Sequence, residues 1–514
     1  MLQDSIFLII LTFILRIIPK FFNNKISSDA WYHITCADNI RKNKHGIPKN
    51  LEGYLLPSGY NYPFVYHFLL SFVSTQTLIK YERIFSGLID GVLILISYVM
   101  FDQVLGDNNM AFEISILLAF SPTLLKVSSG PRAYDLTPRV FSELTTLIYF
   151  LSMYQFYLNS DYLFYLIALF FGTVSFLTNK FSIQVIPIFC LFMGTYLGST
   201  EILVSPLFIF VLTIILSNDR YIKVVKQHFN HLYKYATVLK NEDSFCVKHF
   251  NSIFQYKQFF RSLITLQFKA AFKILNANLV YFNFAYKDFE FFILLALVSF
   301  GGLSYLDGVI SNDSYLAAWL ISGILTFVIT GTYSFKFLGE ADRYLEYAIF
   351  PLYISLSLVF KEYFLVLLVI FILSYLYNIY MFTRAKGLNL RDLYCATKFI
   401  SYNYNCNDYK LLGLISHSSF YQGKLLTGLD TMVSSASEFS KTNWRNNLWD
   451  KYYKPEYPVR TNDFEWMQQE FGVNIILAYQ PYIESVMLSH NHKYNFGEYT
   501  EVFNKNNFVV YVKN

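Results

Sequence analysis

Charged residues are scarce in this sequence. Only 15% of its 514 residues are Asp, Glu, Lys or Arg, and 54% are hydrophobic, whereas a soluble globular chain has about 25% charged residues. This deficit excludes a water-soluble enzyme of this length. The five cysteines form no CxxC pair and have no Cys/His ligand spacing, which argues against a zinc site. The sequence also has no internal repeat and no low-complexity tract.

The hydrophobic residues occur in long blocks. A helix needs about 20 mostly apolar residues to cross a bilayer, and many blocks have that length. The first block lacks a basic segment before it and a small-residue cleavage site after it, so we expect a retained span. The predicted spans are 5–22, 84–104, 110–128, 139–158, 161–178, 183–199, 202–217, 289–307, 313–333, 344–361 and 363–382.

The segment 62–80 begins with a proline region and contains several Ser and Thr residues. We therefore predict a juxtamembrane helix there, within an outer loop 23–83, and no full crossing. With the N-terminus in the cytoplasm, the parity of the spans places this loop and the long basic loop 218–288 on the outer side. The same parity places the whole tail after residue 384 there, so the tail is predicted to be extracytoplasmic.

The tail has the composition of a soluble domain. Residues 410–416 and 473–479 are predicted to be buried strands, 462–471 a helix that leads into the second strand, and 499–512 a hairpin with an Asn-rich turn. The sequence therefore predicts a mainly α, polytopic transmembrane helical bundle in residues 1–384, followed by a small α/β soluble domain in residues 385–514.

Four polar stretches lie at the ends of spans, and the topology places all four on the outer face. The first contains Asp29 and His33 beside Trp and Tyr residues, and the second contains Arg132 and Asp135. A carboxylate at the membrane boundary can act as a general base, although an aromatic belt with a helix cap gives the same pattern. Mixed charges in a loop suit a metal ion or a phosphate, although a Pro-rich surface turn is the plainer interpretation.

The third stretch contains Lys180 in a very short loop, and the fourth contains Glu340, Arg343 and Tyr344. Lys180 is either a phosphate contact or a lysine that extends its ammonium group to the interface. The fourth stretch either binds a charged headgroup or is the solvated start of a helix, where the helix dipole favours acidic residues. Four such stretches on one face together favour a lipid-linked phosphate as the ligand, in a pocket that all four share.

In this order along the chain, the stretches resemble the GT-C superfamily of integral membrane glycosyltransferases. Asp29 lies where these enzymes keep a catalytic acidic residue, and 62–64 resembles their proline motif. The second stretch resembles the metal-binding outer loop of oligosaccharyltransferase catalytic subunits. Residues 178–182 resemble a Thr-His-Lys-type motif, and 339–344 resemble a later Glu/Arg motif.

The resemblance implies a GT-C bundle and a set of roles. Asp29 is the expected catalytic base, and a divalent cation, Mg or Mn, is expected at Asp135 and Glu340. The expected substrate and phosphate contacts are His33, Arg132, Lys180, Arg343 and Tyr344. Because Thr137 stands where a second acidic residue would follow Asp135, the alternative that the cationic side chains alone neutralise the phosphate stays open.

The resemblance further implies the reaction. We expect an enzyme of the plasma membrane that moves one sugar from a polyprenyl-phosphate donor to a hydroxyl of a glycan, lipid or protein acceptor, with inversion and without nucleic acid. The Trp-Trp-Asp-Tyr-Gly motif of oligosaccharyltransferases is absent, which favours this reaction over oligosaccharide transfer to protein. A transporter or flippase of lipid-linked glycans and a non-catalytic assembly subunit are the remaining alternatives.

Overall fold

A computed structural model of the chain describes residues 2–22, 26–55, 59–125, 135–218, 220–234, 256–271, 313–330, 335, 338–339, 342–360, 363–384, 390–415, 420–432, 451–452 and 459–513. The chain forms two compact units. The first, here called the helical unit, comprises Met1–Asn23 and Arg83–Ala385. The second, here called the mixed unit, comprises Asn24–Glu82 and Lys386–Asn514. The first outer loop of the sequence is thus grouped with the tail.

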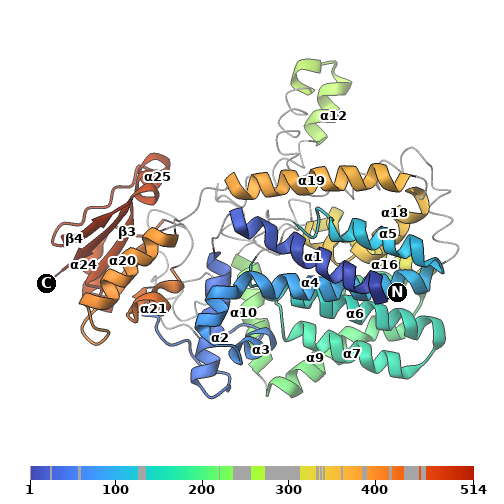
Figure 1. Cartoon of the computed structure of the whole chain (residues 1–514), viewed down its shortest axis with the longest axis horizontal. Coiled ribbons are helices and arrows are strands. Elements are labelled where there is room, and N and C mark those ends of the chain that lie inside the picture. Colours follow the sequence, from blue (N-terminus) through green and yellow to red (C-terminus); the bar gives the residue numbers. More distant parts are fainter. Residues whose placement is uncertain are drawn as a thin grey trace. The chain divides into compact units, whose positions relative to one another are not determined.

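The helical unit is a bundle of apolar helices. Figure 1 shows several of them running lengthwise beside one another. Among the residues that the structure describes, three helices are long and apolar enough to cross a membrane, namely α1, α4 and α9, and shorter apolar helices accompany them. The helices are α1 (Leu2–Phe22), α4 (Thr75–Leu105), α5 (Asn108–Ala119), α6 (Pro138–Asn159), α7 (Tyr162–Phe176), α8 (Ser182–Leu197), α9 (Thr200–Ser217), α10 (Arg220–Lys234), α12 (Tyr256–Ile264), α16 (Ser314–Thr330), α17 (Asp342–Glu346), α18 (Ile349–Phe360) and α19 (Phe364–Arg384).

Short connections join the helices at the end predicted to face the cytoplasm. Only two residues separate α4 from α5, α6 from α7, and α8 from α9. Asp107, Asp161 and Ser199 each precede a helix there and accept hydrogen bonds from backbone N–H groups of its first turn. Such short loops make consecutive helices antiparallel neighbours, and α6 packs on α7 and α8 on α9.

Two predicted spans differ from the helices observed. In the described part of the segment 110–128, the helix is the twelve-residue α5, which ends at Ala119, shortly before Ser121 and Pro122, and residues 126–128 lie outside the described residues. The segment 344–361 is divided into α17 and α18 at Tyr347. Pro351 has no N–H group to donate to the carbonyl of Tyr347, and the indole Nε1 of Trp319 donates to that oxygen at 2.9 Å. The predicted span 289–307 lies outside the described residues.

The predicted juxtamembrane stretch forms two short helical pieces. The helix α3 (Val65–Ser71) ends before Thr75, where α4 begins. At Tyr81 the backbone of α4 leaves the helical region, with φ −120° and ψ 20°. This kink separates the first six residues of α4 from the apolar remainder, so the segment 62–80 is not one continuous crossing.

A five-stranded mixed sheet forms the centre of the mixed unit. Its strand order is β2-β1-β3-β5-β4, with β1 parallel to β2 and β3, and β5 antiparallel to β3 and β4. Asn506 and Asn507 connect β4 to β5, and both have positive φ, as a tight hairpin turn requires. The predicted strands and hairpin of the tail are therefore present. The strands are β1 (Lys410–Leu414), β2 (Asp430–Met432), β3 (Ile475–Tyr479), β4 (Thr500–Lys505) and β5 (Phe508–Val512).

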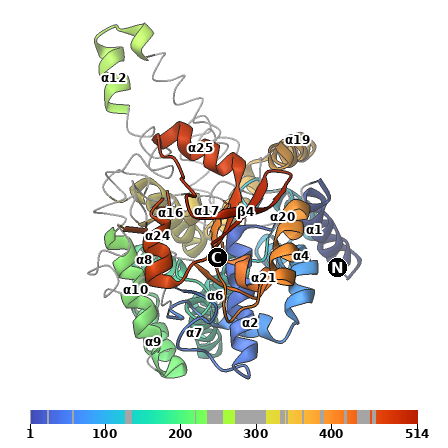
Figure 2. The same cartoon turned by 90° about the vertical axis from the view of Figure 1, so that its left-hand side faces the viewer.

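Helices cover both faces of this sheet. Alternate strand residues point to opposite faces: Leu411 and Ile475 pack with residues of α20 (Leu390–Asn403), whereas Leu412 and Ile476 pack with residues of α24 (Phe464–Phe471) and α25 (Gln480–His490). Figure 2 shows α20, α24, α25 and β4 of this unit from a second side. The sequence predicted α24 but not α20 or α25.

The first outer loop contributes its own elements to the mixed unit. Thr431 in β2 donates its N–H to Gly53 and accepts from Leu55 through its carbonyl, so a short piece of this loop extends the edge of the sheet. The helix α2 (Ser28–Lys42) packs on α3 and on α21 (Gln422–Thr427). The rings of Tyr32 and Tyr421 lie 5.0 Å apart at this contact.

Candidate functional site

The mixed unit places Asp29 and His33 on the same face of α2. Ser27 begins this helix, and its hydroxyl accepts a hydrogen bond from Ala30 N–H at 3.1 Å. Asp29 lies in the first turn and is exposed, where the positive end of the helix dipole favours the ionised carboxylate. His33 follows four residues later and is buried. An exposed anionic oxygen therefore lies one helical turn from a buried imidazole.

His33 belongs to a buried chain of hydrogen bonds. Its Nδ1 atom lies 2.7 Å from Nε2 of His67, and Nδ1 of His67 lies 2.6 Å from the hydroxyl of Tyr60. Burial lowers the pKa of His33 to about 3 and also holds the pKa of His67 well below its usual range. Both imidazoles are therefore neutral at physiological pH. Neither His67 nor Tyr60 was predicted as a site residue, because nothing in their spacing distinguishes them from an interfacial aromatic belt.

A neutral chain of this kind has two consistent proton arrangements. If Tyr60 donates to His67, then Nε2–H of His67 donates to Nδ1 of His33, and Nε2 of His33 carries a proton. If His67 donates to Tyr60, then His33 donates from Nδ1, and its Nε2 atom is an acceptor. Nε2 of His33 can thus be either a hydrogen-bond donor or a hydrogen-bond acceptor, and the proton positions on Tyr60 and His67 determine which.

In the helical unit, Asp135 is buried and forms an ion pair with Lys20 at the end of α1. The hydroxyl of Ser86 also donates to the backbone carbonyl of Asp135. Lys20 thus supplies positive charge to a carboxylate that the sequence predicted as a metal ligand. Within the residues that the structure describes, no three His, Cys, Asp or Glu side chains gather as metal ligands. The other predicted ligand, Glu340, lies outside the described residues, so a divalent cation stays a prediction.

A second buried ion pair joins the second polar stretch of the sequence, residues 130–139, to the fourth, residues 339–347. Arg139, in the first turn of α6, lies with its Nε atom 3.1 Å from Oε2 of Glu346 in α17, and its Nη2 atom contacts Oε1. Glu143, one turn further along α6, lies 3.3 Å from the same guanidinium group. Two carboxylates share one guanidinium, which fixes α17 against the start of α6.

The third and fourth stretches also meet in the helical unit. The guanidinium of Arg343 lies 5.7 Å from the ring centre of Phe181, the residue after Lys180. The hydroxyl of Tyr344 donates to Oε1 of Gln184 at 2.8 Å, and this side chain lies 2.8 Å from Nε2 of His228 in α10. Tyr344 is fully buried, whereas Lys180 and Arg343 are half-buried.

The predicted site residues are therefore distributed over both units. Asp29 and His33 belong to the mixed unit, and Asp135, Lys180, Arg343 and Tyr344 belong to the helical unit. Arg132 lies outside the described residues. The structure brings the second, third and fourth stretches together through Arg139 and Tyr344, while a single pocket that also contains Asp29 stays a prediction.

Comparison with known proteins identifies the fold. No family model matches the sequence, and no curated protein matches it either. The structure is similar to an oligosaccharyltransferase of Archaeoglobus fulgidus, with a TM-score of 0.56, 12% identity, and coverage of 93% of this chain and 69% of that chain. ArnT of Cupriavidus metallidurans resembles it less, with a TM-score of 0.44, 11% identity, and coverage of 98% of this chain and 97% of that chain. The chain is thus an integral membrane protein with the GT-C fold that its sequence motifs predict.

Proposed function

We propose that this chain is a glycosyltransferase that transfers one sugar from a polyprenyl-phosphate donor to an acceptor hydroxyl at the outer face of the plasma membrane. The main support is the position of Asp29, an exposed carboxylate on α2 directly after the first span of a GT-C fold. A carboxylate there can accept a proton from a substrate in the membrane interface.

In the proposed reaction, the acceptor oxygen forms a bond to the anomeric carbon, and the bond from that carbon to the phosphate oxygen breaks. The electron pair of the broken bond leaves with the polyprenyl phosphate, and the acceptor proton moves to Asp29. A single displacement of this kind inverts the anomeric configuration. Nε2 of His33 provides a hydrogen bond to the substrate, with the direction set by His67 and Tyr60.

The leaving phosphate needs positive charge, because its negative charge grows as the bond breaks. We assign this role to Lys180, Arg343 and Arg132, of which the first two lie on adjoining segments around Phe181. Asp135 has a positive partner in Lys20, and the proposed reaction uses the side chains of the protein alone. Re-addition of Mg²⁺ or Mn²⁺ after chelation tests the alternative in which Asp135 and Glu340 hold a cation.

The central test is Asp29→Asn in the full-length protein. Purified protein in lipid nanodiscs is supplied with a panel of radiolabelled polyprenyl-phosphate hexoses and with membrane extracts as acceptor. Loss of the general base should lower transfer about 10²–10⁴-fold, without a change in thermal stability. Glu52→Gln is the matched control, because Glu52 is an exposed carboxylate of the same unit. Transfer by Asp29→Asn at the control rate would remove Asp29 from the base role.

A second candidate function follows from the structure to which the chain is similar, since the archaeal protein is an oligosaccharyltransferase. An acceptor peptide with an Asn-X-Ser/Thr sequence separates the two proposals. Glycosylated peptide would favour transfer to protein, whereas label in glycan or lipid alone would favour the hydroxyl acceptor. A transporter or flippase would instead move the intact labelled donor between leaflets without any transfer.

A further inference from the structure

A buried chain of hydrogen bonds in the helical unit connects α10 with α17 through α8. The hydroxyl of Tyr344 in α17 donates to Oε1 of Gln184 in α8 at 2.8 Å. Nε2 of the same amide lies 2.8 Å from Nε2 of His228 in α10. All three side chains are buried, where hydrogen bonds in a network are stronger than in water. The proposed reaction has so far given no role to His228 or Gln184.

The direction of these hydrogen bonds makes His228 the acceptor at one end of the chain. A glutamine amide has an oxygen that accepts and a nitrogen that donates. Because the oxygen of Gln184 accepts from Tyr344, its nitrogen donates to Nε2 of His228. That ring nitrogen supplies a lone pair. Partners at both ends therefore hold the amide of Gln184 in one orientation.

The helix α10 holds His228 in place through its buried face. Tyr221, Val224 and His228 are buried and follow the spacing i, i+3 and i+7, which places them on one side of the helix. The ring centre of Tyr221 lies 6.2 Å from that of Phe176 at the end of α7, and the backbone N–H of Tyr221 donates to the hydroxyl of Ser217 at the end of α9. His228 therefore presents its ring nitrogen from a packed position.

The helix α17 depends on side-chain contacts for its position, because a helix of five residues is marginal by itself. The ring centre of Tyr344 lies 4.8 Å from that of Phe181, and the guanidinium of Arg343 lies 5.7 Å from the same ring. Phe181 follows Lys180 and directly precedes α8, whose first turn contains Gln184. The hydrogen bond from Tyr344 to Gln184 thus fixes the segment of Arg343 against the segment of Lys180.

This arrangement needs the acceptor on His228. Without it, the amide nitrogen of Gln184 would be buried without that partner, which costs free energy, and the amide would no longer be fixed in one orientation. The hydroxyl of Tyr344 has a second acceptor in the backbone carbonyl of Leu338, at 3.3 Å. Tyr344 would then donate to Leu338 instead of Gln184, and α17 would lose its hydrogen bond to α8.

We propose that His228 and Gln184 are positioning residues for the phosphate of the donor. They hold Tyr344 against α8 and so keep Arg343 beside the segment that contains Lys180. This inference rests on the proposed function, which assigns Lys180 and Arg343 to the leaving phosphate. His228 and Gln184 act through Tyr344 and do not themselves contact the substrate.

The test measures binding of geranyl phosphate to the full-length protein in detergent by microscale thermophoresis. Geranyl phosphate carries a phosphate on a short prenyl chain, and geraniol is the same chain without the phosphate. His228→Leu removes the acceptor, whereas His228→Gln keeps one, because a glutamine oxygen lies as many bonds from Cα as Nε2 of histidine. Asn230→Leu is the matched control, since Asn230 is an exposed polar residue of the same helix.

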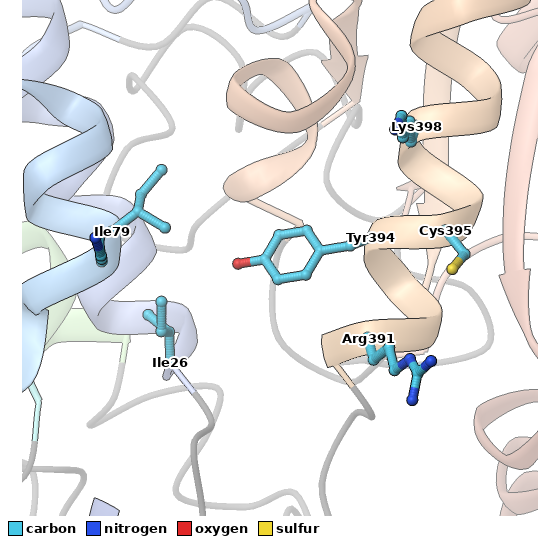
Figure 3. A pocket seen from close by; sticks show the side chains of 7 residues that line it. Ile26, Ile79, Arg391, Tyr394, Cys395 and Lys398 are labelled. Atoms are coloured by element: carbon cyan, nitrogen blue, oxygen red, sulfur yellow. The ribbon is translucent and has the colours of Figure 1, made fainter.

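Binding of the probe elsewhere on the protein needs its own control. Cationic side chains also line a cleft of about 590 Å³ in the mixed unit, and Figure 3 shows two of them, Arg391 and Lys398, on α20 beside Tyr394. Arg391→Gln/Lys398→Gln should bind geranyl phosphate as the wild type does, and Lys180→Gln/Arg343→Gln should bind it more weakly. Loss of binding in the cleft variant alone would overturn the proposed phosphate contacts, and the positioning role with them.

His228→Leu should bind geranyl phosphate about threefold to tenfold more weakly than the wild type, which is the size expected for one lost hydrogen bond. Its binding of geraniol should be unchanged, and His228→Gln should bind both probes as the wild type does. The double variant His228→Leu/Tyr344→Phe should bind geranyl phosphate no more weakly than the weaker single variant, because both changes interrupt the same chain.

The possible failures separate the positioning role from the proposed function. If His228→Leu and Asn230→Leu bind geranyl phosphate equally while Lys180→Gln/Arg343→Gln loses binding, the positioning role is overturned and the proposed function stands. An equal loss of both probes in His228→Leu, or no recovery in His228→Gln, would show a general structural role and would also overturn the proposal. A wild type that binds geranyl phosphate no better than geraniol would overturn the proposed phosphate contacts and the positioning role together.

Discussion

Acidification should lower the stability of the mixed unit, because His33 and His67 are buried as neutral rings. The folded state holds the pKa of His33 at about 3, well below the value of about 6.5 in an unfolded chain. As the pH falls below 6.5, the unfolded state takes up the proton first, so stability is lost progressively from about pH 6.5 down to about pH 3. Above pH 7 both states are neutral, and the pair contributes no pH dependence.

The expected size of this effect follows from the two pKa values. At pH 5 the difference of about 1.5 pH units from the unfolded pKa corresponds to about 2 kcal/mol for His33 alone. The shift of His67 has the same sign, but the two rings share one hydrogen bond and their effects are not additive. We therefore expect a loss of at least about 2 kcal/mol in local opening free energy between pH 7 and pH 5.

Hydrogen–deuterium exchange measures this quantity in the intact protein. Peptides from α2 and α3 report the opening free energy at pH 7 and pH 5, after correction for the intrinsic exchange rate. The double variant His33→Gln/His67→Gln should lose most of the pH dependence, whereas His45→Gln, in the same unit, should keep it. Equal opening free energies at the two pH values in the wild type would refute the burial argument, as would an unchanged pH dependence in the double variant.

Two further predictions concern packing in the helical unit. Arg16 and Asp90 are fully buried, and Nε of Arg16 lies 2.6 Å from Oδ2 of Asp90. Arg16→Met should therefore destabilise the protein by about 3–5 kcal/mol, because it removes the cation beside a buried carboxylate, and adding Asp90→Leu to this variant should restore most of that loss. Denaturant unfolding in detergent measures both effects, and an equal loss of stability in the double variant would contradict the pairing. A Cβ atom on Gly323 would lie 2.4 Å from Cβ of Ala348, so Gly323→Ala should cost about 1–3 kcal/mol, and Ala348→Gly should rescue it. Failure of that rescue in thermal unfolding would show that the close contact does not limit stability.

Hydropathy and local turn signals predicted much of the architecture from sequence. The bilayer requires long apolar helices, so α1, α4 and α9 follow from composition alone. The hairpin of the tail was predictable because Asn506 and Asn507 tolerate the positive φ values of a tight turn. The break between α17 and α18 within 344–361 was harder to predict from sequence. It depends on a hydrogen bond from Trp319 to the carbonyl of Tyr347, which Pro351 leaves without a helical donor.

Ion pairs between residues far apart in the chain could not be predicted from the sequence. Lys20 and Asp135 are 115 positions apart, and Arg139 and Glu346 are 207 positions apart. Helical periodicity relates only residues within a few turns, so it cannot show which charge neutralises which. The sequence thus predicts Asp135 as a metal ligand, which stays a prediction, but it could not show that the ammonium group of Lys20 pairs with this carboxylate.

The neutrality of His33 also limits which of the predicted substrate contacts can offset the charge of a phosphate. An imidazole whose pKa is about 3 carries no charge at physiological pH, so it cannot offset the charge of a leaving phosphate. In the proposed reaction, that task is therefore assigned to Lys180, Arg343 and Arg132. In the proposed reaction, His33 instead provides a hydrogen bond to the substrate, and the direction of this bond depends on Tyr60 and His67. The first polar stretch of the sequence is therefore suited to handling a proton, and the third and fourth stretches are suited to holding an anion.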